Sequence, residues 1–422
     1  MNNQKKLLII SSLWCEPNSS AAGQRISQLI ALFLAQNWQI TFASIAVKSP
    51  HRQDLSKLGI QETQIQLNHA SFDVFIKDLS PTIVLFDRFI SEEQFGWRVR
   101  QYSPQSFTIL DSEDLHSLRD VRHKMLKAQL KKTATVDFEP LLDQATLYQQ
   151  MIAEDMAKRE IAAIYRCDLC LIISLFEMDL LSRYFLINPE QLYYLPFLFQ
   201  AQKSTLPTFE QRQDFIWIGN FRHQPNWDAV LWLKQQIWQP IRHALPTAQL
   251  LIYGAYPPKK ATDLNHKKDG FLIKGWVEDS QQAVEQARIY LAPLRFGAGL
   301  KGKLFSAMLA QTPSITTPIG AEGIHQGLSW GGKIALDAAQ ISQSAIQLYQ
   351  NKTAWHEAQQ QGTTILSTHF DLSRISDFIN TVDDYLKNLN AYRELNFIGQ
   401  LLNHHQHQST KYMALWIEAK NK

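Results

Sequence analysis

The chain has 422 residues, of which 45% are hydrophobic and 19% are charged, with 42 basic residues against 39 acidic ones. This length predicts two domains with separate cores, and the near balance of charge lacks the basic excess typical of nucleic-acid-binding proteins. Three cysteines are too few for a disulfide framework and favour a reducing compartment.

The N-terminal residues lead from polar side chains into a short apolar run, residues 7–10. This run is shorter than the apolar region of a secretory signal, and no stretch reaches the roughly 18 apolar residues of a spanning helix. We therefore expect a cytoplasmic protein. Its lysine clusters leave open a peripheral contact with the inner membrane face, but solvated surface is the simpler interpretation.

The first half of the chain alternates short apolar runs with amphipathic ones. Apolar residues in 24–36 recur at i, i+3, i+4, i+7 and i+8, which predicts a helix with one buried face. Alternating strands and helices predict a parallel sheet covered on both faces. The predicted strands are residues 6–11, 39–47, 82–87, 107–111, 169–174 and 191–195.

A mostly polar stretch, residues 198–213, predicts a linker. A second α/β series follows it, with strands predicted at 215–218, 249–253, 271–274, 289–292 and 314–317. The two series predict an α/β protein with two Rossmann-like domains facing each other across a cleft. We assign residues 1–200 to an N-terminal domain, 213–375 to a C-terminal domain and 376–422 to a helical segment.

The most informative segment is residues 291–324, where an apolar run enters a turn that contains Gly297 and Gly299. Lys301 and Lys303 follow at once, before a predicted helix. Glycines at such a turn let backbone N–H groups approach a ligand, and a helix N-terminus favours an anion. Two ammonium groups at this point suit a diphosphate.

Three earlier strands of the second series also end near glycines. Gly219 precedes Arg222, which could reach a phosphate, and Gly254 ends the next strand. Val277 follows Gly275 and could present backbone groups to a nucleobase. The alternative for the first of these turns is an ordinary strand–turn–helix, with Asn226 or Asp228 as a helix cap.

These blocks together resemble the group 1, glycogen-synthase-like glycosyltransferases of the GT-B fold. The blocks that resemble this family are, in chain order, IWIGNFRHQPNWDAV, LLIYGAYP, GFLIKGWVED, LAPLRFGAGLKGK and TTPIGAEGI. The resemblance implies a nucleoside-diphosphate sugar as co-substrate, transfer with retention of configuration, and no obligatory metal or other cofactor. It places Lys301 and Lys303 at the donor diphosphate and Gly299 at the phosphate-approach turn, with Arg222 assisting.

The sequence departs from the family pattern at one donor-binding position. Many members carry two glutamates around this turn, whereas here Ser306 stands at the second and Ala298 at the first. The resemblance implies that the second glutamate holds the donor ribose, so this contact is in question. Glu322 is a candidate for a nearby carboxylate; an exposed turn residue is the alternative.

The first domain would supply the acceptor side. Gly23 and Arg25, near the start of the first helix, are candidates for the cleft floor; serine capping is the alternative. Asp111, Glu113, Asp114 and His116 follow a strand, where they suit sugar hydroxyls. The alternative is that Asp111 or Ser112 caps a helix whose first turn contains Glu113. We expect His116 to be a hydrogen-bonding or proton-handling group, and not a nucleophile.

The leading hypothesis is therefore a glycosyltransferase that moves a hexose-type sugar to a hydroxyl acceptor. The alternatives are a transferase-like binding protein without turnover, suggested by Ser306, and a sugar-nucleotide epimerase. The pair Cys167 and Cys170 has CxxC spacing, but no second pair accompanies it, so buried thiols are the preferred interpretation. We expect no metal site, including at His404, His405 and His407, for which an exposed helix is preferred.

Overall fold

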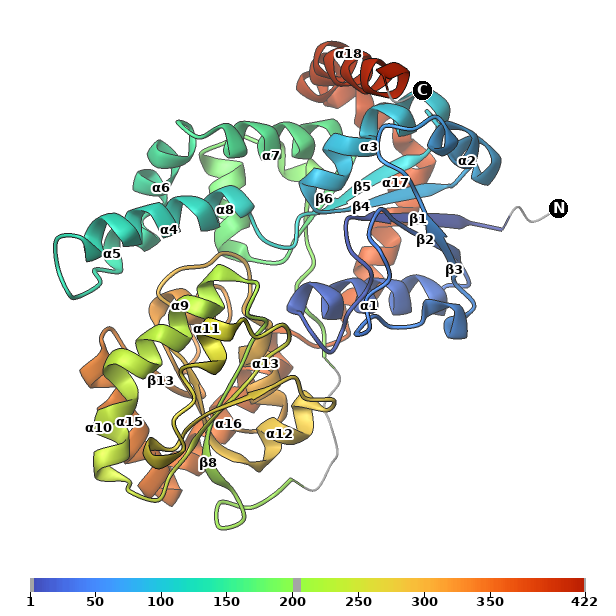
Figure 1. The fold of residues 1–422 in the computed structure, drawn as a ribbon. Coiled ribbons are helices and arrows are strands. Elements are labelled where there is room, and N and C mark those ends of the chain that lie inside the picture. The colour runs from blue at the N-terminus through green and yellow to red at the C-terminus, as the bar shows by residue number, and fades with distance from the viewer. Residues whose placement is uncertain (1–3, 200–205, 421–422) are drawn as a thin grey trace.

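The computed structural model describes residues 4–199 and 206–420, which form two parallel sheets with helices on both faces (Figure 1). The first sheet has the strand order β3-β2-β1-β4-β5-β6-β7 and the second β10-β9-β8-β11-β12-β13. The strands of the first sheet are β1 (Lys6–Ser11), β2 (Gln39–Ser44), β3 (Gln61–Gln64), β4 (Ile83–Asp87), β5 (Phe107–Asp111), β6 (Leu169–Ile172) and β7 (Leu192–Tyr194). Those of the second are β8 (Gln213–Ile218), β9 (Leu250–Tyr253), β10 (Phe271–Gly275), β11 (Ala287–Ala292), β12 (Ser314–Thr316) and β13 (Gly332–Ile334).

The strands that run through the middle of each sheet are almost entirely apolar. In β1, Leu7, Leu8, Ile9 and Ile10 are all buried, and β1 pairs in parallel with both β2 and β4. Continuous apolar strands are expected where helices cover both faces of a parallel sheet. The predicted α/β fold with two parallel sheets is confirmed.

Two strands were not predicted from the sequence. β3 has the sequence QETQ and lies at an edge of the first sheet, where its first and last residues are exposed and the two between them are partly buried. β13 is three residues long and forms an edge of the second sheet. Both lack the run of buried apolar residues on which strand prediction depends.

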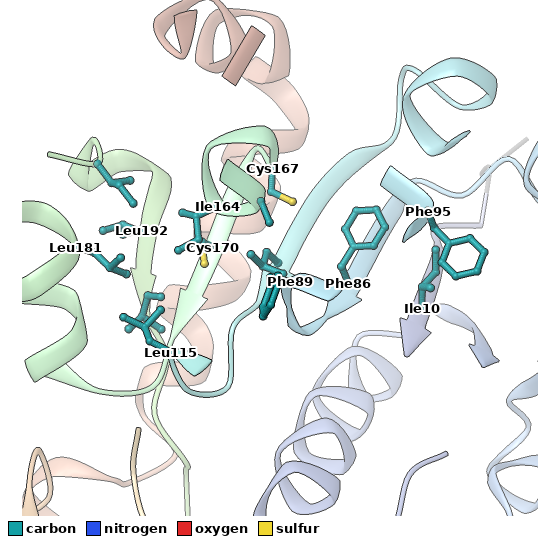
Figure 2. Close-up of a cluster of buried hydrophobic side chains, with 14 of the residues drawn as sticks. Ile10, Phe86, Phe89, Phe95, Leu115, Ile164, Cys167, Cys170, Leu181 and Leu192 are labelled. Carbon is teal, nitrogen blue, oxygen red and sulfur yellow. The ribbon is translucent and has the colours of Figure 1, made fainter. Parts of the chain in front are cut away.

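The core on one face of the first sheet contains closely packed aromatic and aliphatic side chains (Figure 2). Phe86, Phe89 and Phe95 come from β4 and the helix after it, and Cys167 and Cys170 pack in the same cluster. All three cysteines of the chain are buried free thiols, as the sequence predicted for the CxxC pair.

The helices of the first half are α1 (Ala21–Ala35), α2 (Ser71–Leu79), α3 (Arg88–Tyr102), α4 (His116–Leu130), α5 (Glu139–Leu142), α6 (Gln144–Met151), α7 (Asp155–Arg166) and α8 (Leu175–Arg183). Those of the second half are α9 (Gln224–Trp232), α10 (Trp238–Ala244), α11 (Lys259–Thr262), α12 (Ser280–Gln286), α13 (Gly302–Leu309), α14 (Pro318–Ala321), α15 (Ala338–Gln350) and α16 (Lys352–His369). Among the described helices, none combines the length and apolar character needed to cross a bilayer.

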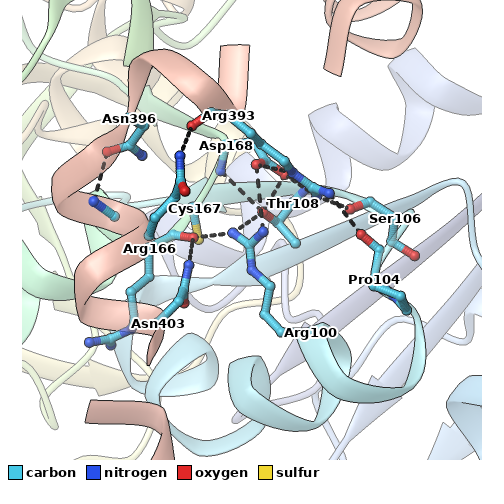
Figure 3. Close-up of polar contacts among 12 residues, drawn as sticks. Arg100, Pro104, Ser106, Thr108, Arg166, Cys167, Asp168, Arg393, Asn396 and Asn403 are labelled. Atoms are coloured by element: carbon cyan, nitrogen blue, oxygen red, sulfur yellow. Dashed lines mark hydrogen bonds and ion pairs between the residues drawn. The ribbon is translucent and has the colours of Figure 1, made fainter. Parts of the chain in front are cut away.

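The chain ends with two long helices that return to the first sheet, α17 (Arg374–Leu395) and α18 (Phe397–Lys420). Tyr385 of α17 stacks on Phe107 of β5 with ring centroids 5.2 Å apart. Arg393 donates to Asp168 over 2.8 Å and to the carbonyls of Pro104 and Ser106, which fixes the end of α17 (Figure 3). The last helices therefore belong to the first half of the molecule in space.

Candidate functional site

A cavity of about 450 Å³ lies between the two sheets, and residues of both halves line it. Its walls come from strand ends and the segments that follow them, including Asp87 at the end of β4, Glu113 after β5, Gly219 after β8 and Gly254 after β9. Ligand sites of open parallel sheets lie at the carboxyl ends of their strands. The fold thus places the predicted turns of both halves around one cavity.

The glycines that end β8 and β9 leave no room for a side chain. A Cβ at Gly254 would lie 2.1 Å from the carbonyl oxygen of Gly219, and one at Gly219 would lie 2.8 Å from Asn226. Both glycines line the cavity, as does Val277 after β10. The backbone therefore forms this wall directly.

Lys301 and Lys303 both line the cavity, and their predicted contact with a diphosphate stays a prediction. The Nζ of Lys301 donates to the carbonyl oxygen of Gly299 over 2.7 Å, and its side chain is buried. The Nζ of Lys303 donates to Asn226 and lies 4.8 Å from the centroid of the Trp217 ring. Burial lowers the pKa of both ammonium groups, that of Lys303 to about 7.

Helix α13 begins at this cavity. Its N-cap residue is Lys301, and no side chain caps its first turn. Gly302, Lys303 and Ser306 of its first two turns line the cavity. The uncapped amides and the positive end of the helix dipole favour an anion at this position, next to the two lysines. Ser306 itself donates to the carbonyl of Gly302 over 3.4 Å, within its own helix.

Two predicted donor residues are outside the cavity lining. Gly299 has a φ of +62°, and its N–H donates to Glu177 of α8 over 2.8 Å. A Cβ at this glycine would lie 2.7 Å from the Cβ of Asp114, so the residue is needed for a close approach of the two halves. This N–H is bound to protein, which corrects the expectation that Gly299 presents it to a phosphate.

Glu322 is buried and forms an ion pair with Arg122 of α4, with Nη1 2.9 Å from Oε1. The Nζ of Lys301 lies 3.8 Å from the same oxygen. Both expectations for Glu322 therefore need correction: it is not an exposed turn residue, and its carboxylate is held by Arg122 outside the cavity lining.

Arg222 lies at the exposed rim of the cavity, with its guanidinium 3.6 Å from the ring centroid of Tyr256. Tyr256 donates from its hydroxyl to Glu16 across the cleft over 3.1 Å. Trp276 of the second half stacks on His51 of the first, with ring centroids 4.8 Å apart. The helix-cap alternative for this region is wrong, because no side chain caps α9; Asn226 donates to the carbonyl of Asn220 instead.

On the opposite wall, Gly23 and Arg25 line the cavity from α1. Ser20 caps this helix by accepting from the N–H of Gly23 over 3.0 Å, so the capping alternative is correct here. Arg25 is buried, and its Nη2 is 3.2 Å from Asp111. Asp111 does not line the cavity, so its predicted contact with an acceptor is replaced by this ion pair with Arg25.

Glu113, Asp114 and His116 follow β5 and all line the cavity. Glu113 adopts a left-handed backbone with a φ of +58°, its Oε1 is buried without a hydrogen-bond partner, and burial raises its pKa well above the ordinary value. Burial lowers the pKa of His116 to about 4, so this imidazole is neutral at pH 7. Its Nε2 is 3.6 Å from Asp114, which also accepts a hydrogen bond from Arg119.

The capping alternative for the helix after β5 is wrong. No side chain of residues 111–115 caps α4, and the N–H groups of His116 and Ser117 donate to the carboxylate of Glu160 over 2.8 and 3.0 Å. Residues 111–114 are therefore not used to start this helix, which leaves Glu113 free to face the cavity.

Sequence reasoning did not identify Arg88 as a site residue, although it noted the strand before it. Arg88 lines the cavity in a left-handed conformation with a φ of +66°, and it donates to Asp87 over 3.0 and 2.8 Å. Two strained residues, Arg88 and Glu113, thus follow adjacent strands at one wall, as is common in functional sites. Among the described side chains, which do not include those of residues 405–408, no group of three or more His, Cys, Asp or Glu residues could hold a metal ion.

Comparison with known proteins supports the resemblance found in the sequence. Residues 212–351 match the model of the family described as Glycosyl transferases group 1. TarM has a TM-score of 0.65 at 9% identity, covering 90% of this chain and 99% of that one. Sucrose-phosphate synthase from Thermosynechococcus elongatus has a TM-score of 0.62 at 13% identity, covering 91% and 100%.

HepE of Anabaena in complex with UDP and glucose gives a TM-score of 0.60 at 10% identity, covering 89% of this chain and 99% of that one. At these identities the structures show a shared GT-B fold. No curated protein sequence matches the chain.

Proposed function

We propose that the chain, whose residues 212–351 match the family described as Glycosyl transferases group 1, transfers a sugar from a nucleoside diphosphate to a hydroxyl acceptor with retention of configuration. The observation that carries this proposal is the placement of Lys301 and Lys303 at the uncapped start of α13, inside a cavity shared by both halves. The acceptor would be a glycan, a lipid-linked sugar or a small molecule.

The donor diphosphate would lie against the first turn of α13, between the two ammonium groups. An approaching dianion favours the protonated form of a lysine, so the lowered pKa of Lys303 would rise when the donor binds. The backbone walls at Gly219 and Gly254 leave space for the nucleoside. HepE is seen with UDP and glucose, so uridine nucleotides are the first to test.

Catalysis would depend on positioning and on charge. The lysines and helix amides would stabilise the negative charge that develops on the departing diphosphate, where a water-poor site strengthens each interaction. On the opposite wall, neutral His116 could accept or donate a hydrogen bond to a hydroxyl of the reacting sugar. The proposal needs no cofactor beyond the donor, which is a co-substrate.

The test is UDP binding by isothermal titration calorimetry with the double variant Lys301→Ala/Lys303→Ala. We expect a loss of affinity of about a hundredfold or more, since two charge-assisted contacts are removed. The matched control is Lys267→Ala/Lys268→Ala, which removes the same charge from an exposed turn of the same half. Unchanged UDP affinity in the first variant, with a wild-type melting temperature, would refute the proposed donor site.

A second candidate function is sugar-nucleotide binding without turnover. Ser306 favours it, because this side chain bonds within its own helix and offers no carboxylate to a ribose. Incubation with UDP-sugars separates the two functions. Slow release of UDP supports a transferase, since water can replace the acceptor, whereas binding with no release even when acceptors are supplied supports the silent protein.

A further inference from the structure

The last helix, α18, presents large apolar side chains to solvent. Phe397 is 68% exposed, Tyr412 64% and Trp416 59%. Exposed apolar residues that stand alone are ordinary, but a contiguous group marks an interaction surface. We call the group in this part of the chain the α18 apolar surface: Leu395, Phe397, Ile398, Leu401, Tyr412, Met413, Leu415 and Trp416.

Helical geometry places most of these residues on one face. Eighteen residues make five turns of an α-helix, so Phe397 lies in line with Leu415, and Ile398 with Trp416. Leu401 and Tyr412 are eleven residues apart, close to three turns, and share that face. Between the two ends of the surface, residues 404–408 are histidine and glutamine in the sequence.

The opposite face of α18 is already bound to the first half of the molecule. Ala414 is buried, and Glu418 lies 3.5 Å from Arg98 of α3. Asn396 donates to the carbonyl of Tyr165 over 2.7 Å at the start of the helix, and Asn403 contacts the carbonyl of Arg166 (Figure 3). The helix is therefore docked by its inner face, and the apolar surface faces away from its own domain.

The charged residues of α18 follow the same division into an inner face and an outer face. Glu418 is its only carboxylate in the sequence, and this residue is buried. Lys420 is exposed and lies 5.1 Å from the ring centroid of Trp416, and Lys411 is partly exposed beside Tyr412. The outer face of α18 thus combines aromatic side chains with cations and has no acidic residue, while the exposed Glu394 lies just before the helix, beside Leu395.

We propose that the α18 apolar surface docks the protein on an anionic lipid membrane. Helices that lie in a membrane interface combine Phe, Leu and Trp with lysines, as this face does. A second copy of the chain fits less well, because this face of α18 carries lysines and no carboxylate to pair with them. α18 lies at the outer edge of the molecule beyond the first sheet, on the far side from the second sheet (Figure 1).

The test is flotation of the full chain with vesicles of phosphatidylcholine, with and without phosphatidylglycerol. We expect binding to the mixed vesicles and little binding to pure phosphatidylcholine. Phe397→Glu/Trp416→Glu should reduce the bound fraction about tenfold or more, because it places two carboxylates on the docking face. Val47→Glu/Leu186→Glu is the control, since it makes the same kind of change at two exposed apolar residues elsewhere.

Melting temperature and UDP affinity should match the wild type in both variants, so a loss of flotation cannot come from unfolding or from the donor site. Absence of flotation with the vesicles that contain phosphatidylglycerol would overturn the proposal, as would flotation of the Phe397→Glu/Trp416→Glu variant equal to that of the wild type. Light scattering coupled to gel filtration measures the oligomeric state and so tests whether a second copy of the chain occupies this surface. A wild-type dimer that this variant dissociates, together with no vesicle binding, would assign the surface to a second copy.

Discussion

Arg122 of α4 and Glu322, which follows α14, form a buried ion pair that joins the two halves of the molecule. Nη1 of Arg122 is 2.9 Å from Oε1 of Glu322 and 2.8 Å from the carbonyl oxygen of Gly297. One arginine of the first half thus holds both the Gly297 turn and the Gly-Ala-Glu-Gly turn of the second. The turn that carries Lys301 is fixed from outside the cavity.

We expect Glu322→Ala to destabilise the protein by about 3–5 kcal/mol, because it leaves the guanidinium of Arg122 buried without its anionic partner. Arg122→Met/Glu322→Met removes both charges and should cost less than the single change. The measurement is the melting temperature of the three proteins by calorimetry. A single variant as stable as the wild type would mean that this pair does not secure the interface.

UDP affinity should fall as the pH rises above about 7. The free Lys303 has a pKa of about 7, because burial disfavours its ammonium. A bound diphosphate raises that pKa, so binding above pH 7 takes up a proton and weakens by up to about tenfold per pH unit. UDP itself keeps a constant charge in this range, since its last phosphate proton leaves near pH 6.

Lys303→Arg provides the control for this titration, because a guanidinium stays charged throughout the range. Its UDP affinity, measured by calorimetry between pH 7 and 9, should vary less than that of the wild type. Parallel curves for the two proteins would show that Lys303 does not titrate at the bound nucleotide.

The sequence predicted the fold well because the strands of the middle of each sheet are buried on both faces. Residues 6–11 and 107–111 are read directly as apolar runs, and they are the strands β1 and β5. The edge strand β3 could not be found in this way, since its sequence QETQ has no apolar residue to bury. The turn with Lys301 and Lys303 could be found from the sequence because glycines followed by lysines at a helix start are typical of anion-binding turns.

The partners of buried charges were not predictable. Glu322 pairs with a residue 200 positions earlier, and Gly299 donates to Glu177, 122 positions earlier. The spacing of residues along the chain does not indicate which residues of two separately folded halves contact each other. Arg88 was missed, and Glu113 was assigned either to the acceptor side or to a helix start. The reason is related, since left-handed backbone at a non-glycine residue has no signal in a single sequence.

Ser306→Ala should change UDP affinity by less than about twofold. The hydroxyl of Ser306 lines the cavity but donates to the carbonyl of Gly302, one turn earlier in α13. Its removal leaves the two lysines and the first-turn amides in place, and the lost hydrogen bond, worth about 0.5–1.5 kcal/mol, affects folding stability and not the contacts to UDP. The measurement is the UDP affinity of Ser306→Ala and of Lys301→Ala by calorimetric titration. A loss of affinity in Ser306→Ala as large as that in Lys301→Ala would show that the serine contacts the donor.

Glu177→Gln should stabilise the protein relative to the wild type as the pH rises from about 4.5 to 8. Oε1 of Glu177 accepts from the N–H groups of Leu115 and Gly299, Oε2 is buried without a hydrogen-bond partner, and burial raises the pKa to about 8. Between the ordinary carboxyl pKa and 8, the folded state holds a proton that the unfolded chain has released. The unfolded state then binds fewer protons, so the stability of the wild type falls with rising pH across this window.

Glutamine keeps an oxygen for the two N–H donors and removes the titration, so the variant lacks this decline. The measurement is the melting temperature of both proteins between pH 5 and 8.5, with the exposed Glu278→Gln as the control. Groups that titrate in both proteins, such as Glu160 with a pKa of about 7, cancel in the difference. A difference between wild type and Glu177→Gln that stays constant across the range would show that Glu177 is already ionised in the folded protein, with the contact to Gly299 made by a carboxylate.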